Sequence, residues 1–559
     1  MTEDRATRQL EPESVPALPS RGSLLAPSRD VVLRLAVHLA VWAPFVVGVV
    51  EDVRLRWRPV GDGAAIAVRS WDSLTAYGPL VGQASRLAYE VYDPGPLEYW
   101  LLAIPVHVDP RYGELWGAAL WCMIAASLAI EAARSALGGL GGFIGAAVIL
   151  GILAWYPGIA LHPFWNPWFG VMFFLAVLAA SWAALSGNRR WWVVLVVAGS
   201  VASQAHLMFA LPSVALVVLT LAVGLVDSLR TKSGYRWVLA GLIIGAGCWV
   251  APFIQQVTGR RGNLAFLLKG QGTGPVSGAA FGLKTLTASI RPPPLWWPAS
   301  NRLHQLPALQ RIADRPAGFA VAALIVIAAV LVVAVRPLRS RRLAALAAIS
   351  LLVSLAALVT YSRIPAGNTG LSALNYLDVI TFPVGVLAWL VVGSAVVLAG
   401  RRLISRRPAW AAAPGTPSAA PRAGWAARIA ILAAVALIAW WSVRAVAQSE
   451  PARAAPLAAM VSPASQRVEH ALPPQQIALF ISEQRSLVSV LGLVWTLRAD
   501  GYRPLVSHRD ARELGSAYVF SDQPVPQVTL YVRGDRVRVR VVRPGPRYRM
   551  PRASAGVGT

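Results

Sequence analysis

Residues 31–50 read VVLRLAVHLAVWAPFVVGVV, and residues 61–69 read GDGAAIAVR. The first stretch is long and apolar enough to cross a bilayer as one helix, because roughly 20 apolar residues span the hydrocarbon core. The second opens the loop that follows this helix, and it carries a carboxylate, Asp62. A loop rich in carboxylates at the mouth of a membrane bundle needs a reason beyond solubility.

The rest of the chain repeats the apolar pattern. The sequence has 559 residues, of which 56% are hydrophobic and 14% are charged, whereas soluble domains carry about 25% charged residues. This composition predicts an α-helical polytopic membrane protein with about 11 spans. The stretch 97–108 is apolar but too short to cross, so we expect it in the outer interface. The expected spans lie near residues 31–50, 113–134, 142–158, 167–186, 190–206, 207–227, 236–254, 317–335, 342–361, 375–399 and 426–446.

The net charge of +26 comes from arginines that gather in short loops between the spans. Such loops face the cytoplasm in membrane proteins, so the charge indicates orientation in a lipid bilayer, and we expect no nucleic-acid partner. Only two cysteines occur, Cys122 and Cys248, and both lie inside apolar runs. That placement argues against a disulfide framework or a zinc site.

The alternating basic loops place the N-terminus in the cytoplasm and the C-terminus outside, in a multi-pass protein of the plasma membrane. Residues 1–30 are expected to form a disordered cytoplasmic tail. Residues 31–446 form the membrane domain, with long outer loops at 51–112 and 255–316. Residues 447–559 are expected to form a small extracytoplasmic α/β domain. Its predicted elements are a strand at Gln476–Ile481, a helix at Ser486–Ala499 and paired strands at Pro526–Val532 and Arg536–Val542.

Asp62 is the first candidate for chemistry. If its surroundings are helical, Asp62 and Arg69 share one face of the helix. A plain surface pair is the simpler interpretation, yet the turn containing Asp93 and Glu98 folds this loop back toward the membrane. A carboxylate such as Asp62 can act as the base that sugar transfer to a hydroxyl requires. An arginine such as Arg69 matches the geometry of the phosphate that leaves in such a reaction.

Three further polar patches are expected on the same outer side. Their alternatives are an interfacial tryptophan belt, a histidine packed between helices and a loop that anchors the interface. As functional sites, the patch at 161–168 would stack on and hydrogen-bond a sugar, the patch at 203–206 would face a cavity, and the patch at 255–263 would bind a phosphate. The patches are residues 161–168 with His162, Trp165 and Asn166, residues 203–206 with His206, and residues 255–263 with Arg260 and Arg261.

At these residues the chain resembles the C-type (GT-C) glycosyltransferase superfamily, in which an acidic residue of the first outer loop precedes a Pro-Gly-Pro-Leu segment with aromatic residues. It is more closely similar to a group of uncharacterised actinobacterial multispanning proteins. The shared motifs fall at Gly61-Asp62, Pro79-Leu80-Val81-Gly82, Pro94-Gly95-Pro96-Leu97, Trp165-Asn166-Pro167, Gln204-Ala205-His206-Leu207 and Val257–Leu264.

The resemblance implies transfer of a sugar from a polyprenyl-phosphate-linked donor to a glycan or glycolipid acceptor of the cell envelope, with Asp62 as base and inversion at the anomeric carbon. Many members of the superfamily carry a second acidic residue in the next outer loop. This chain has His162 and Asn166 there, so a divalent metal is possible but not required. Asp93 or Glu98 is the candidate substitute for the missing carboxylate.

Two other classes of function remain open. A flippase or transporter of a lipid-linked precursor needs charges along a path through the membrane midplane. Here the span interiors carry few charges, which favours an enzyme. A non-catalytic envelope subunit that binds glycan through its basic C-terminal region is the third possibility.

Overall fold

The computed structural model describes residues 29–85, 91–259, 261–269, 275–296, 311–366, 368–405, 420–449, 455–481, 487–507, 511–521, 524–533 and 536–542. The predictions for the tail at 1–28 and for Arg260 lie outside the described residues.

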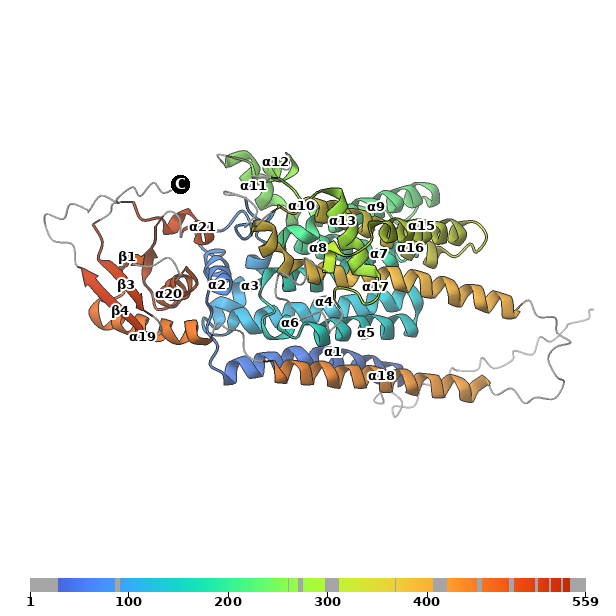
Figure 1. Ribbon diagram of the computed structural model, residues 1–559, viewed down its shortest axis with the longest axis horizontal. Helices are drawn as coiled ribbons and strands as arrows, with labels where there is room; N and C mark the ends of the chain where they lie inside the picture. The colour runs from blue at the N-terminus through green and yellow to red at the C-terminus, as the bar shows by residue number, and fades with distance from the viewer. Residues whose placement is uncertain are drawn as a thin grey trace, which may run out of the picture.

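The membrane region is a bundle of helices (Figure 1). In the part of the chain that the structure describes, eight helices are long and apolar enough to cross a membrane, and α10 and α11 form a further pair that is bent by 47°. The eight are α1 (Arg29–Arg54), α4 (Gly113–Leu137), α7 (Asn166–Leu185), α9 (Leu207–Thr231), α15 (Ala317–Val335), α16 (Arg341–Ser362), α17 (Asn368–Ser405) and α18 (Ala420–Gln448).

The remaining predicted spans also coincide with helices. The bent pair is α10 (Tyr235–Cys248) with α11 (Val250–Thr258). Two predicted spans correspond to shorter helices, α5 (Gly139–Trp155) with 17 residues and α8 (Trp191–Ala205) with 15 residues. The membrane architecture is therefore confirmed, while the expected number of about 11 spans is approximate. The other helices of this region are α2 (Asp62–Asp72), α3 (Leu97–Val108), α6 (Gly158–Leu161), α12 (Asn263–Lys269) and α13 (Gly278–Ile290).

Helix α7 lies at the centre of the bundle. It is apolar on all sides, which is typical of a helix surrounded by other helices, and 89% of its most apolar window is buried. Its neighbour α4 presents a series of buried alanines, including Ala118, Ala125 and Ala129. Small side chains let helix backbones approach closely in a membrane protein. Because α7 begins at Asn166, this packing also fixes the position of a candidate site residue.

The C-terminal region forms a small α/β unit with a four-stranded sheet in the order β2-β1-β3-β4. Strand β1 is parallel to β2 and β3, and β3 is antiparallel to β4. The predicted strands and helix are confirmed to within about one residue at their ends. The short strand β2 was not predicted. The elements are α19 (Ala455–Ala471), β1 (Gln476–Ile481), α20 (Leu487–Ala499), β2 (Arg503–Leu505), α21 (Ala511–Leu514), a 3-10 turn (Ser516–Tyr518), β3 (Gln527–Arg533) and β4 (Arg536–Val542).

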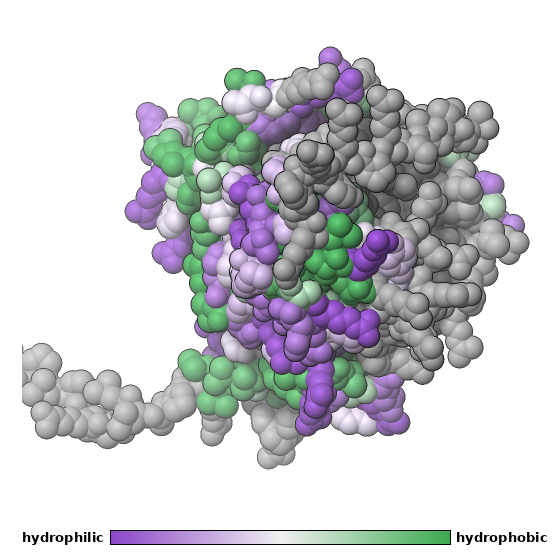
Figure 2. Space-filling model, turned by 90° about the vertical axis from the view of Figure 1, so that its left-hand side faces the viewer, coloured by the Kyte–Doolittle hydropathy of each residue, from purple (hydrophilic) through white to green (hydrophobic). Residues whose placement is uncertain are grey.

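This unit packs directly on α2 at one end of the bundle (Figure 1). Trp71 of α2 meets Trp495 of α20 edge to face, with ring centroids 5.9 Å apart. The buried carboxylate of Asp72 accepts a hydrogen bond of 3.2 Å from the Tyr518 hydroxyl and lies 3.6 Å from the Arg498 guanidinium. Figure 2 views this end of the molecule, where hydrophilic residues gather beside hydrophobic ones. The C-terminal unit therefore covers the C-terminal end of α2, the helix that begins at Asp62.

Candidate active site

Asp62 is the first residue of α2, which confirms the conditional prediction of a helix here. Gly61 precedes it with a positive φ angle of 56°, which glycine adopts without steric cost. The half-buried Asp62 carboxylate accepts a hydrogen bond of 3.1 Å from the indole N–H of Trp165. At Gly63, an added Cβ would lie 2.8 Å from the Phe164 ring. The start of α2 therefore lies against residues 162–168, and two of the predicted patches meet.

The 162–168 turn is a compact aromatic cluster. The Trp165 and Trp168 rings meet edge to face with centroids 4.7 Å apart, and the His162 ring stacks on Trp168 at 6.2 Å. Burial lowers the pKa of His162 to about 4, so its imidazole is neutral at neutral pH. Trp165 is only partly buried, and its ring is the member of the cluster that also contacts the candidate base.

Asp93 joins the first loop to two helices. Its Oδ1 accepts a hydrogen bond of 2.9 Å from the backbone N–H of Leu207, the first residue of α9, and its Oδ2 accepts one of 3.0 Å from the Asn166 side chain. Its backbone carbonyl accepts from the N–H of Gly82 at 3.0 Å. Burial raises the pKa of Asp93, and the bonds from Leu207 and Asn166 oppose this effect. Both carboxylate oxygens are thus engaged in ordering the loop.

Asn166 and His206 lie on either side of this junction. The Asn166 amide also donates to the carbonyl oxygen of Ala205 at 3.1 Å. His206 is the N-cap of α9, and its Nδ1 accepts from the backbone N–H of Met208 at 3.2 Å. The structure therefore brings together Asp93, Asn166 and His206 at the meeting point of α7, α8 and α9.

Glu98 lies in the first turn of α3 and is 4% exposed. Burial raises the pKa of Glu98, and the nearby Asp93 carboxylate raises it further. Within the described part of the chain, Oε1 of Glu98 has no hydrogen-bond partner. Burial therefore favours the neutral form of this carboxyl group more than it would for an exposed glutamate.

Arg69 is directed toward the C-terminal unit. Its Nη1 donates to the backbone carbonyl of Leu514 at 3.2 Å, and its guanidinium carbon lies 5.9 Å from the centre of the Tyr99 ring. Because Arg69 is two turns along α2 from Asp62, the side chain links the candidate loop to α21. Local sequence gave no signal for this contact, since the partners are 445 residues apart.

The structure describes the 255–263 patch except for Arg260. The carbonyl of Arg261, an exposed residue, accepts from the Gln255 amide at 3.0 Å. Asn263, which is 3% exposed, was not chosen as a site residue from the sequence. Its Oδ1 accepts from the N–H of Tyr92, and its Nδ2 donates to the Tyr92 carbonyl, both at 3.1 Å. The amide of Asn263 thus pairs with the backbone beside Asp93, and its place in the Gly-Asn segment was the available signal.

Among the residues that the structure describes, no group of three or more His, Cys, Asp or Glu side chains is arranged to hold a metal ion. The indole N–H of Trp165 donates to the Asp62 carboxylate, and an indole is not an oxygen ligand of the kind that Mg²⁺ or Ca²⁺ prefers.

Comparison with known proteins supports the fold. No family model matches the chain, and no curated protein matches its sequence. The crystal structure of ArnT from Cupriavidus metallidurans bound to undecaprenyl phosphate is similar to this structure, with a TM-score of 0.50 and 18% sequence identity. The match covers 92% of this chain and 98% of ArnT. The chain therefore has an ArnT-like fold. The closer similarity to an actinobacterial group stays a prediction.

Proposed function

We propose that this protein is a membrane glycosyltransferase that moves a sugar from a polyprenyl-phosphate-linked donor to a glycan or glycolipid acceptor of the cell envelope. The reaction takes place on the extracytoplasmic face, where the C-terminal unit lies, and the N-terminus is cytoplasmic. One observation carries the proposal. The Asp62 carboxylate is held by the Trp165 indole at the start of α2, the helix on which the C-terminal unit packs, in a fold shared with a protein solved with undecaprenyl phosphate.

In this mechanism Asp62 takes the proton of the acceptor hydroxyl. The acceptor oxygen bonds to the anomeric carbon of the donor as the bond from that carbon to the phosphate oxygen breaks. The polyprenyl phosphate leaves with the electron pair, and the configuration at the sugar inverts. A carboxylate is suited to this step when it lies within hydrogen-bond reach of the hydroxyl, and Asp62 is partly open to solvent.

The other candidates have supporting roles. Arg69 and either Arg260 or Arg261 hold the departing phosphate, since a guanidinium pairs with phosphate oxygens through a fixed fork of donors. Trp165 stacks on the sugar. His162, Asn166, His206 and Asp93 order the pocket through the contacts described above, and the buried Glu98 lies near Asp93 and is kept as a candidate substrate-binding residue. Because the described residues offer no metal-binding group, no step is assigned to a metal.

The test is sugar transfer by the purified full chain in lipid nanodiscs, supplied with a panel of polyprenyl-phosphate sugars. Asp62→Asn retains an oxygen for the Trp165 indole but loses basicity, so the rate should fall by about 10²- to 10⁴-fold. Asp109→Asn is the matched control. Asp109 is also half-buried and also accepts from an indole, that of Trp116 at 3.3 Å.

The control should transfer sugar at nearly the wild-type rate. Equal rates for wild type and Asp62→Asn would refute the assignment of the base. Saturable binding of the donors without turnover of any of them would instead favour a flippase or an accessory subunit.

A further inference from the structure

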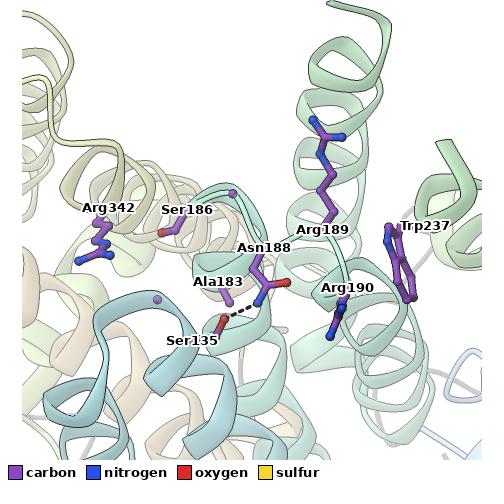
Figure 3. Close-up of a pocket in the computed structure, with 10 residues that line it drawn as sticks. Ser135, Ala183, Ser186, Asn188, Arg189, Arg190, Trp237 and Arg342 are labelled. Atoms are coloured by element: carbon purple, nitrogen blue, oxygen red, sulfur yellow. Dashed lines mark hydrogen bonds between the residues drawn. The ribbon is translucent and has the colours of Figure 1, made fainter. Parts of the chain in front are cut away.

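A second polar site lies at the far end of the bundle from Asp62. It is a cavity of about 540 Å³ where α4 and α7 end and where α8, α10 and α16 begin (Figure 3). Helix α7 runs from Asn166, beside the candidate active site, to Leu185, beside this cavity. Its 20 residues separate the two sites by roughly 30 Å, at 1.5 Å per residue.

Three arginines line the cavity: Arg189, Arg190 and Arg342. Arg189 is neutralised, because its Nη2 donates to the Asp227 carboxylate at 2.9 Å. Arg190 and Arg342 are exposed, and neither has an ion-pair partner within the described ranges. In Figure 3 they stand on opposite sides of Asn188. The cavity thus carries two guanidinium groups whose charges are not balanced locally.

Two hydrogen bonds hold Arg342 at the cavity, one to its backbone carbonyl and one made by the preceding residue, Arg341. The Trp182 indole donates to the Arg342 carbonyl at 2.9 Å, and Arg341 donates to the Leu185 carbonyl at 2.7 Å. These bonds join the start of α16 to the end of α7. The side chain of Arg342 is therefore presented from a fixed backbone, which reduces the entropy lost when it binds an anion.

Neutral polar groups complete the lining. The hydroxyl of Ser186 is buried and has no hydrogen-bond partner among the described residues. Asn188 donates to the Ser135 hydroxyl at 2.7 Å, which orients the amide at the centre of the cavity. Trp237 forms one wall, and tryptophan is enriched at the level of lipid headgroups. A buried hydroxyl without a partner is costly, and an anion at this position would accept a hydrogen bond from it.

We propose that this cavity binds the phosphate group of an anionic membrane lipid. Guanidinium groups match phosphate oxygens in charge and geometry, and basic pockets between membrane helices are suited to lipid headgroups. Arginines that served only to orient the chain would not need to converge on one cavity. A lipid is the source because the cavity lies where α4 and α7, two of the membrane helices, end.

The experiment is native mass spectrometry of the full chain in neutral detergent, titrated with phosphatidylglycerol, with phosphatidylcholine, and with inorganic phosphate as competitor. The probe variant is Arg190→Gln with Arg342→Gln. The control is Arg336→Gln with Arg401→Gln, two exposed arginines. They lie at the same end, where Arg402 donates to the Pro337 carbonyl at 3.1 Å.

Phosphatidylglycerol should bind the wild type and the control equally, and the probe variant about tenfold more weakly. Arg190→Gln alone, at an exposed position that the fold does not need, should weaken binding in part. Equal weakening in probe and control would overturn the proposal, because general surface charge would then explain the binding. Displacement of the lipid by inorganic phosphate at similar concentration would overturn the lipid as the source. Equal affinity for phosphatidylcholine would overturn the requirement for an anionic headgroup.

Discussion

The junction around Asp93 supports a quantitative prediction. Asp93→Ala removes the acceptor for the Leu207 N–H and for one Asn166 N–H, and Asp93 is 4% exposed. Each buried donor left unpaired costs about 1–3 kcal/mol, so the substitution should destabilise the protein by roughly 2–6 kcal/mol. Asp93→Asn should destabilise the protein less, because the asparagine oxygen still accepts from the Leu207 N–H. Some loss of stability should remain, because its N–H₂ group then faces the Asn166 donor.

The assay is thermal unfolding in one fixed detergent, with wild type, Asp93→Ala, Asn166→Ala and the double variant measured together. Because the two side chains share a hydrogen bond of 3.0 Å, their effects should not add. The coupling free energy should be about 0.5–3 kcal/mol. Additive losses of stability would refute the shared contact. A wild-type melting temperature for Asp93→Ala would refute the structural role of the carboxylate altogether.

Three more outcomes are expected. Trp165→Phe keeps a ring but removes the N–H that binds the carboxylate of Asp62, the proposed base, so transfer should slow by about tenfold or more at unchanged stability; an unchanged rate would count against the contact. An added Cβ at Gly48 overlaps the backbone carbonyl of Ala160, whereas Gly247 has open space around it. Gly48→Ala should therefore cost about 1–3 kcal/mol, with Gly247→Ala as the neutral control, and equal melting temperatures would contradict this. Since the pKa of His162 falls from 6.5 to about 4 on folding, the unfolded chain binds more protons between these values. Stability should then rise with pH across this window, and the rise should disappear in His162→Asn.

Much of the architecture was predictable because its signals are local. Hydrophobic length located the membrane helices, and alternation with turn residues located β1, β3 and β4. Strand β2 was missed because it has three residues and includes Pro504, and so short a segment carries no periodicity. The helices α5 and α8 coincide with two predicted spans, although they have only 17 and 15 residues.

The sequence predicted which residues belong to the candidate site, but not which of them contact one another. Asp62, Trp165, Asp93 and Asn166 were each identified from turn-rich, polar segments, but not their pairing. Asp62 bonds to a residue 103 positions away, and Asp93 to one 73 positions away. Arg69 is predicted to bind a phosphate, and its bond to Leu514, which links it to the C-terminal unit, was not predicted.

The sequence by itself determined which segments enter the bilayer and which carry polar groups, because hydrophobicity and turn propensity act over a few neighbouring residues. Only the tertiary structure decided which of those groups meet. The starts of α2, α7 and α9 converge through helix packing, and the basic cavity forms where the opposite ends of α4 and α7 meet α8 and α16. Contacts between helix ends depend on how whole helices pack, and that information is distributed over the entire chain.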